Sequence, residues 1–243
     1  MNLIIDVGNS FVKLAVFKDG LIKHKVTVKL DSVLSEVKVL NKKYTSIESA
    51  IISSVGKLKK KDISAISEYL DLLELDFNTK LPFDNLYKTP KTLGVDRLAL
   101  VSASVRRFSD KNVLIIDAGT CVTYDFINRD NEYLGGAISP GIRVRYKSLN
   151  NLTANLPLLE SEIPKNITGA STEESIHSGV IYGILHEIDG VIESYKLKYS
   201  DLTVILTGGD AKFLSKQLKS SIFANPNFLL EGLNFILQFN SNE

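Results

Sequence analysis

The sequence predicts an α/β protein built from two similar halves. Along the whole chain, short apolar runs rich in β-branched residues alternate with segments in which apolar residues recur every three or four positions. The opening run "LIIDVGNSFVKLAVF", residues 3–17, also returns in nearly the same design as "LIIDAGTCVTYDF", residues 114–126. A polar break at residues 109–112 precedes the second copy. Each half therefore begins with a strand, a turn and another strand.

The repeat gives the expected domain boundary. Asp6 and Asp117 lie 111 residues apart, and at that offset the three apolar residues before each aspartate and the glycine two positions after it also coincide. Apolar strands match one another easily, so the shared Asp-x-Gly is the stronger part of the repeat. We expect one domain at residues 1–111 and a second at residues 112–243.

Strands are expected where apolar runs are short and β-branched, and helices where apolar residues repeat along one face. In the first half this places strands at residues 3–6, 12–17, 26–30 and 48–55, and helices at residues 32–41, 63–73 and 93–108. In the second half it places strands at residues 113–117, 122–127, 132–139 and 201–207, and helices at residues 141–153 and 174–198.

Composition and charge exclude several classes of protein. Apolar residues make up 44% and charged residues 23% of the chain, and the net charge of +1 gives no general attraction to nucleic acid or membranes. The single cysteine, Cys121, excludes an intramolecular disulfide and fits a reducing compartment. The start "MNLIIDVGNS" does not resemble a signal peptide, and no apolar stretch reaches the ~20 residues of a membrane helix. We expect a cytoplasmic protein without nucleic-acid or membrane partners.

Each repeated turn places an aspartate at the end of a buried strand, beside a glycine and short polar side chains. An aspartate that only starts a turn would explain one such pattern, and solvation would explain Lys13. Two equivalent copies favour ligand binding, because glycine lets backbone N–H groups approach a polyphosphate. Two carboxylates near a polyphosphate would each be repelled by about 4 kcal/mol at ~4 Å unless a cation lies between them. The aspartates therefore imply bound cations, usually Mg²⁺.

Several common motifs are missing from the sequence. It has no GxxxxGK[ST], GxGxxG or HExxH pattern, and His24, His177 and His186 are scattered, so we expect no zinc site. The run "VILTGGDA" offers bare backbone against which a flat base could lie, or it is an ordinary turn from strand to helix. The charged run at Lys57–Lys61 contains no aromatic residue and is expected to be a solvated loop.

Two acidic turns, one in each half, and a late glycine-rich turn resemble the actin-like ATPase superfamily, and type III pantothenate kinases in particular. "DVGNS", "YKTPKTLGVDR", "DAGT" and "YLGGAISPG" are similar to the motifs of that family in order and spacing, and "LNNLTANLP" and "GASTEESIHSGVIYG" also fit. The resemblance spans nearly the whole chain, although Ser10 stands where the family often has threonine. It implies two actin-like, ribonuclease H-like α/β domains with a nucleotide cleft between them.

The resemblance also implies an activity: transfer of the ATP γ-phosphate to the primary hydroxyl of pantothenate, the first step of coenzyme A biosynthesis. Asp96 resembles the general base, and Asp117 resembles a ligand of a monovalent cation, K⁺ or NH₄⁺, needed besides Mg²⁺. ATP contacts are implied for Asp6, Val7, Gly8, Asn9, Ser10, Phe11, Val12, Lys13 and Thr120. Pantothenate contacts are implied for Tyr87, Gly94, Val95, Asp96, Arg97 and Thr172. Thr172 would reach in from the partner subunit of a homodimer.

Simpler alternatives stay open for several of these residues. Asp96 and Arg97 also form a common pair at the start of a surface helix, and "STEE" at residues 171–174 is a helix-capping pattern. Three glycines in the long helix, Gly179, Gly183 and Gly190, each cost roughly 1 kcal/mol and suggest close packing, on a partner subunit or within the chain. For the whole protein, the alternatives are a kinase with another small acceptor and a non-catalytic ATP-binding regulatory protein of the same fold.

Overall fold

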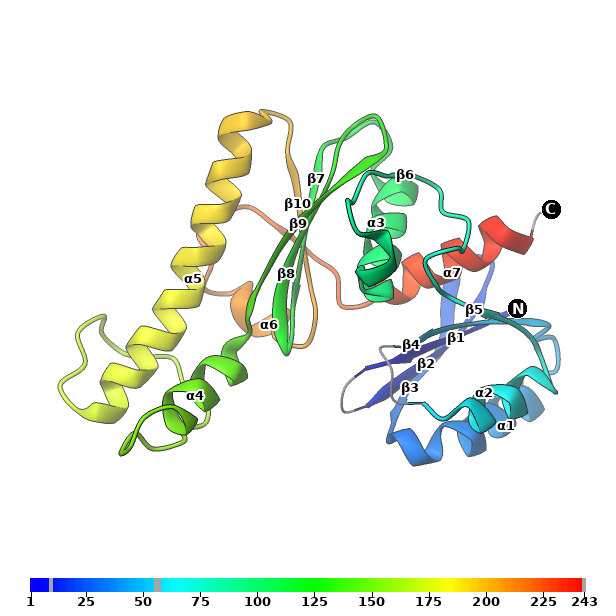
Figure 1. Cartoon of the computed structure of the whole chain (residues 1–243), viewed down its shortest axis with the longest axis horizontal. Helices are drawn as coiled ribbons and strands as arrows, with labels where there is room; N and C mark the ends of the chain where they lie inside the picture. Colours follow the sequence, from blue (N-terminus) through cyan, green and yellow to red (C-terminus); the bar gives the residue numbers. More distant parts are fainter. Residues whose placement is uncertain (9–10, 55–57, 242–243) are drawn as a thin grey trace. The chain divides into compact units, whose positions relative to one another are not determined.

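The chain folds into two compact units, each an open sheet with helices on its faces (Figure 1). The computed structural model describes residues 1–8, 11–54 and 58–241. By their contacts, the first unit contains residues 1–109, 131–133 and 227–243, and the second contains residues 110–130 and 134–226. The domain boundary near residue 111 stays a prediction, and the contacts place the C-terminal residues with the first unit.

The first unit is built on a five-stranded sheet in the order β3-β2-β1-β4-β5. β1 pairs antiparallel with β2 and parallel with β4. Asp19 and Gly20, both with positive φ, close the hairpin between β2 and β3, as an Asp-Gly pair does in tight hairpins. The strands are β1 (Asn2–Val7), β2 (Val12–Lys18), β3 (Leu21–Val28), β4 (Ser49–Ser54) and β5 (Asp71–Glu74).

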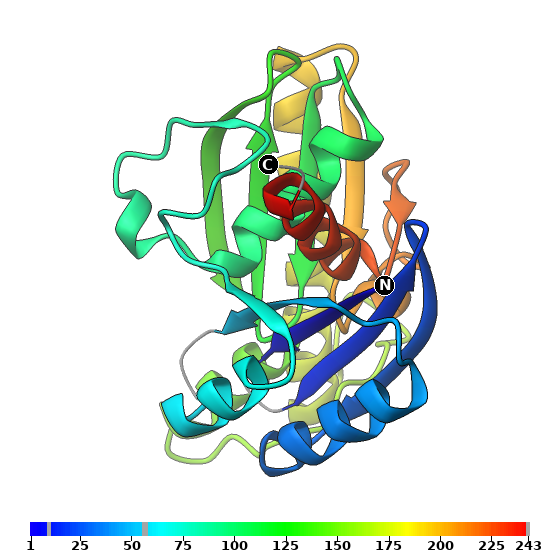
Figure 2. The same ribbon diagram turned by 90° about the vertical axis from the view of Figure 1, so that its right-hand side faces the viewer.

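Helices cover both faces of this sheet (Figure 2). One face packs on α1 and α2, and the other on α3 and α7. Gly232 of α7 lies against the backbone carbonyl of Ala99, where any Cβ would collide, so glycine lets α7 and α3 pack closely. The helices are α1 (Val33–Lys43), α2 (Lys60–Ser67), α3 (Val95–Arg107) and α7 (Phe228–Ser241), with 3₁₀ turns at Leu30–Ser32 and Pro90–Thr92.

The structure corrects two expected elements in this unit. The helix predicted over residues 63–73 ends at Ser67, and Leu72 and Leu73 instead lie in β5, which pairs in parallel with β4. The helix-like spacing of Leu73 is overridden because, in a strand, Leu72 and Leu73 pack into the cores on opposite faces of the sheet. The third strand also begins at Leu21, earlier than the predicted 26–30.

The second unit repeats the strand order of the first. Its sheet runs β11-β10-β7-β8-β9, in which β7 pairs antiparallel with β8 and parallel with β10, as β1 does with β2 and β4. The strands are β7 (Val113–Ala118), β8 (Cys121–Ile127), β9 (Glu132–Pro140), β10 (Thr203–Thr207) and β11 (Phe223–Ala224). The first two residues of β9 also pair with β6 (Asp84–Asn85). The two copies of the sequence repeat therefore begin sheets with the same strand order and, around β1 and β7, the same pairing directions.

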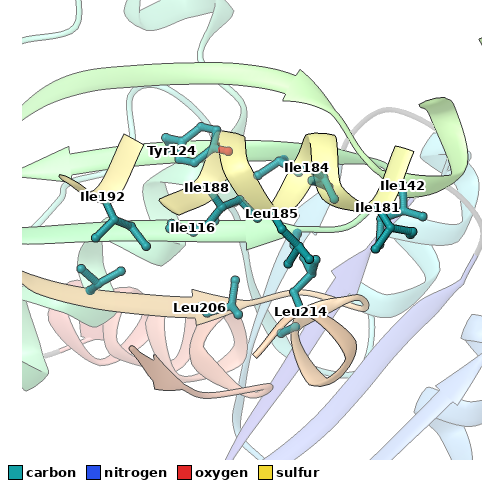
Figure 3. Packing of buried hydrophobic residues seen from close by; sticks show 14 of the residues in the cluster. Ile116, Tyr124, Ile142, Ile181, Ile184, Leu185, Ile188, Ile192, Leu206 and Leu214 are labelled. Carbon is teal, nitrogen blue, oxygen red and sulfur yellow. The ribbon is translucent and has the colours of Figure 1, made fainter. Parts of the chain in front are cut away.

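The long helix α5 (Thr172–Lys198) fills one face of the second sheet. Figure 3 shows its apolar stripe, including Ile184 and Ile188, packed toward Ile116 of β7 and Leu206 of β10. The helix begins where Ser171 accepts a hydrogen bond from the Glu174 amide at 3.2 Å, which is half of the predicted capping box. The remaining helices of the unit are α4 (Ile142–Asn151) and the short α6 (Ala211–Leu214).

Candidate active site

The first acidic turn follows the C-terminal end of β1, which contains Asp6. Asp6 is 8% exposed and lies directly opposite Lys13 of β2, whose Nζ is 3.5 Å from Oδ2 of Asp6. Burial raises the pKa of Asp6 above its ordinary value; the ammonium of Lys13 opposes this shift, and the nearby Asp96 carboxylate adds to it. Asp6 is therefore a desolvated carboxylate influenced by a partly exposed lysine of the same sheet and by a second acid from helix α3.

The described part of the turn between β1 and β2 contains one backbone hydrogen bond, at Gly8. The amide of Gly8 donates to the carbonyl of Phe11 at 3.1 Å, and Phe11 itself is exposed. Val7 and Val12 are buried in the core on either side, so only their backbones could touch a nucleotide. The predicted contacts Asn9 and Ser10 lie outside the described residues.

The predicted substrate motif opens helix α3. Gly94 is its N-cap, and Val95 and Asp96 follow in the first turn. A Cβ at Gly94 would collide with the Asp96 carboxylate, so the glycine leaves room for that side chain. Arg97 is 4% exposed, and its guanidinium lies 5.6 Å from the centre of the Tyr87 ring. Arg97 is therefore buried in contact with Tyr87, although the sequence pattern alone also allowed a surface pair; the substrate contacts of Asp96, Arg97 and Tyr87 stay a prediction.

The second acidic turn has different neighbours. Asp117, at the end of β7, is in register with Thr123 of β8 and Thr207 of β10. Gly208 has a φ of 96°, and a Cβ there would collide with both the Asp117 carboxylate and the carbonyl of Ala118. Position 208 therefore requires glycine for two reasons: the backbone angle is positive, and a side chain would have no space. An oxygen-rich surrounding of this kind suits a hard cation.

The glycine-rich run at residues 208–210 follows β10 and lies beside the C-terminal end of β7. The amide of Asp210 donates to the carbonyl of Ala118 at 2.9 Å, which fixes the turn beside the second acidic turn. Burial raises the pKa of Asp210. Among the described residues there is no group of three or more histidine, cysteine, aspartate or glutamate side chains placed to hold a metal ion.

Two glycines of "YLGGAISPG" lie against the second acidic hairpin. A Cβ at Gly136 would collide with the carbonyl of Tyr124, and one at Gly141 would collide with the carbonyl of Gly119. The Gly141 amide donates to the carbonyl of Thr120 at 3.0 Å, and the Thr120 side chain is exposed. The two glycines therefore allow close backbone packing against the β7–β8 hairpin. The sequence motif alone did not indicate this role.

Thr172 lies at the first position of α5 and is exposed. It lines a groove of about 890 Å³ in the second unit, together with Arg145, Leu156, Ser175 and Gly179. Because Ser171 caps the helix, the Thr172 hydroxyl is not needed for that purpose. Within the described residues, no atom beyond the helix's own backbone lies within 4 Å of a Cβ built at Gly179 or Gly190, so packing inside the chain does not explain these two glycines.

Sequence analysis missed a polar network in the second unit. Glu187 of α5 accepts from the Tyr124 hydroxyl at 2.8 Å and pairs closely with Arg145 of α4, which also donates to Ser139 at 3.1 Å. Burial pushes the pKa of Glu187 up, but the hydrogen bonds from Arg145, Tyr124 and Ser139 outweigh it and hold that pKa below its ordinary value. The partners are far apart in sequence and share no spacing that could have indicated them.

Comparison with known proteins decides the family. A family model described as type III pantothenate kinase matches residues 2–194. A type III pantothenate kinase of Christiangramia forsetii is 52% identical over 244 residues, covering 100% of both chains. The chain belongs to the type III pantothenate kinase family. It is an ATP-dependent kinase that phosphorylates the primary hydroxyl of pantothenate, the first step of coenzyme A biosynthesis.

Solved structures show that the kinase has the actin-like ATPase fold. A Campylobacter jejuni protein described as a Baf family transcriptional activator superposes with a TM-score of 0.65 at 21% identity, covering 99% of this chain and 100% of that one. A glucokinase from an Antarctic psychrotroph superposes with a TM-score of 0.54 at 12% identity, covering 98% of each chain. At such identities the likeness concerns the fold alone, and the predicted fold class is confirmed.

Proposed function

We propose that Asp96 is the general base of the kinase and that Arg97 binds the carboxylate of pantothenate. The observation that carries this proposal is the start of α3, where the two residues are adjacent and Arg97 is buried against Tyr87. A buried planar guanidinium suits bidentate binding of a carboxylate. The backbone of Gly94 and Val95 and the ring of Tyr87 complete the contacts to pantothenate.

A primary alcohol is a weak nucleophile, so a positioned carboxylate that accepts its proton has a large effect. Such general base catalysis contributes ~10²–10⁴-fold, and positioning and charge neutralisation supply much of the rest. Lys13, whose ammonium is partly exposed, and the exposed Thr120 are the side chains that we expect to contact phosphate oxygens. Mg²⁺, when bound with ATP, neutralises the charge that builds on the transferred phosphoryl group.

Asp117 is proposed to hold the monovalent cation, K⁺ or NH₄⁺. Its support is the donor set: a carboxylate between two threonines in register, with Gly208 leaving space beside its oxygen. Carboxylate, hydroxyl and carbonyl oxygens are the ligands that hard cations prefer.

We also propose a homodimer in which Thr172 contacts the pantothenate of the partner subunit. The exposed Thr172, the groove around it and the uncovered Gly179 and Gly190 support a partner at this face of α5. The connection between α4 and α5 adds apolar surface that a partner would cover. Its exposed large side chains are Leu152, Leu158, Ile163 and Ile167.

A cytoplasmic location belongs to the same proposal. The single cysteine fits a reducing compartment. Within residues 1–8, 11–54 and 58–241, no helix combines the length and the apolar character needed to cross a membrane.

Asp96→Asn tests the assignment of the general base. The amide cannot take the proton of the pantothenate hydroxyl, so we expect kcat to fall about 100-fold or more. The KM for ATP should stay within about twofold, since Asp96 is not expected to bind the nucleotide. ADP release measured with and without pantothenate reports both values. Asp84→Asn, an exposed aspartate of β6, is the matched control, and near-normal turnover of Asp96→Asn would remove Asp96 as the base.

Mixing two inactive variants tests the shared site. Thr172→Arg blocks the contact from one subunit and Asp96→Asn removes the base from the other. Random re-association should then restore about a quarter of the wild-type activity, because half of the dimers are mixed and each holds one intact site. Subunit exchange is followed with two differently tagged chains. Exchange without recovered activity would contradict a site completed by Thr172 of the partner.

A further inference from the structure

Three aromatic rings form a contact cluster, and one of them, Tyr87, lies beside Arg97. Tyr133, at the second position of β9, is fully buried, and its ring stacks on Tyr87 at 6.1 Å between centres with an angle of 19°. Phe83 meets the same Tyr133 ring edge-on, at 6.0 Å and 72°. Both arrangements are among those that aromatic pairs prefer. Tyr133 therefore touches the predicted substrate contact Tyr87 without belonging to the substrate motif.

Backbone hydrogen bonds hold this contact in register. The amide of Leu86 donates to the carbonyl of Tyr133 at 3.1 Å, and the amide of Asp84 donates to the carbonyl of Asn131 at 2.9 Å. The amide of Tyr87 donates to Oδ1 of Asn85 at 3.1 Å. Beyond the two-residue strand β6, the segment before Tyr87 has little regular structure of its own, so β9 supplies the rigid support on which Tyr87 rests.

The contact continues from Tyr87 to the guanidinium of Arg97. Arg97 Cζ is 5.6 Å from the centre of the Tyr87 ring, within the range of a cation–π interaction, and Arg97 is 4% exposed. A long arginine side chain has many rotamers, and contact with a fixed ring restricts them. If Tyr87 moved, the guanidinium would lose one of the surfaces that orient it.

We propose that Tyr133 is a positioning residue of the kinase. Its ring holds Tyr87, and through Tyr87 the Arg97 guanidinium, where the carboxylate of pantothenate binds. This inference rests on the proposed role of Arg97. It places a determinant of acceptor specificity on β9, outside the substrate motif at residues 87–97.

Tyr133→Leu tests the inference because leucine keeps an apolar side chain but removes the stacking ring. We expect the KM for pantothenate to rise about tenfold, with kcat and the KM for ATP within about twofold. The decisive measurement is the ratio of kcat/KM for pantothenate to that for its alcohol analogue, in which CH₂OH replaces the carboxylate. That ratio should fall about tenfold, since only pantothenate uses the guanidinium.

Two variants serve as controls. Tyr133→Phe keeps the ring and should retain the wild-type ratio. Phe126→Leu removes a buried ring from the second unit, where Phe126 stacks on Tyr199 at 4.5 Å, and should lower Tm without changing the ratio. Should Tyr133→Leu fail to fold, Tyr133→Met takes its place, because a flexible methionine fills irregular space.

The outcomes separate this inference from the proposal on which it rests. A Tyr133→Leu enzyme with an unchanged ratio, or one that loses activity equally on both acceptors, overturns the positioning role. Arg97→Met is measured in parallel. If Arg97→Met leaves the ratio unchanged, the proposed role of Arg97 itself fails; if it lowers the ratio while Tyr133→Leu does not, only the role of Tyr133 fails.

Discussion

The two acidic hairpins, β1–β2 and β7–β8, share one design and differ in the residues that face the aspartate. In the first, Asp6 lies opposite Lys13 and beside Ser53; in the second, Asp117 lies opposite Thr123 and beside Thr207. Between the last paired positions lie residues 8–11 in the first hairpin and residues 119–121 in the second. Of the two residues directly opposite the aspartates, only Lys13 carries a positive charge.

We propose that this difference gives the two aspartates different roles. A lysine opposite a buried carboxylate reduces the cost of desolvating it and leaves a partly exposed ammonium for phosphate. Two threonines opposite a carboxylate provide oxygen atoms, which attract a dissolved cation instead. On this proposal, the first hairpin carries a fixed positive charge and the second binds an exchangeable cation, and substitutions at the position opposite the aspartate can test the idea.

The largest effect is expected from Lys13→Thr, which gives the first hairpin the neighbour found in the second. Losing a charged hydrogen bond to phosphate costs about 1.5–3 kcal/mol, so kcat/KM for ATP should fall roughly 10- to 100-fold. Lys25→Thr, in the neighbouring strand β3, is the control, since its ammonium donates to Asn227 and not to Asp6. A normal kcat/KM for ATP in Lys13→Thr would show that this lysine is only a solvated strand residue.

The reverse exchange, Thr123→Lys, should change the dependence on K⁺. Residues directly opposite in an antiparallel pair share a face, so the new ammonium would lie beside Asp117. We expect the ratio of activity in K⁺ to activity in Na⁺ buffer to approach one, and Asp117→Ala to weaken the K⁺ dependence as well. Asp201→Asn, an exposed aspartate bonded to Asn112, should keep the wild-type K⁺ titration. Unchanged titrations in both test variants would contradict a cation site at Asp117.

The smallest effect concerns stability at Asp6. Its pKa is raised in the folded state, so the folded protein keeps the proton to higher pH than the unfolded chain does. Stability is thus lost as pH rises from the ordinary value of 3.8 through the raised one. Asp6→Asn removes this penalty and should raise Tm by about 2–4 °C near neutral pH, with no gain below pH ~4. Melting curves across pH check this; a lower Tm at neutral pH would mean that the ion pair with Lys13 outweighs burial.

Parts of the fold and the site could be predicted because they depend on local pattern. The strands around Asp6 and Asp117 are strongly apolar, and the repeat between them predicted two similar α/β halves. The spacing of Leu70 and Leu73 predicts a helix as far as residue 73, whereas pairing with β4 places Leu72 and Leu73 in a strand. The two-residue strands β6 and β11 have no pattern long enough to be seen in the sequence.

The sequence by itself determined two α/β halves, each opening with an acidic turn, and the motif that places Asp96 before Arg97. Only the tertiary structure decided that Arg97 is buried against Tyr87, that Tyr133 supports this ring, and that Glu187 joins Tyr124 to Arg145. The physical reason is the distance along the chain between the residues that interact. Periodicity and turn chemistry act between neighbours along the chain, whereas the orientation of a side chain depends on residues brought beside it by folding.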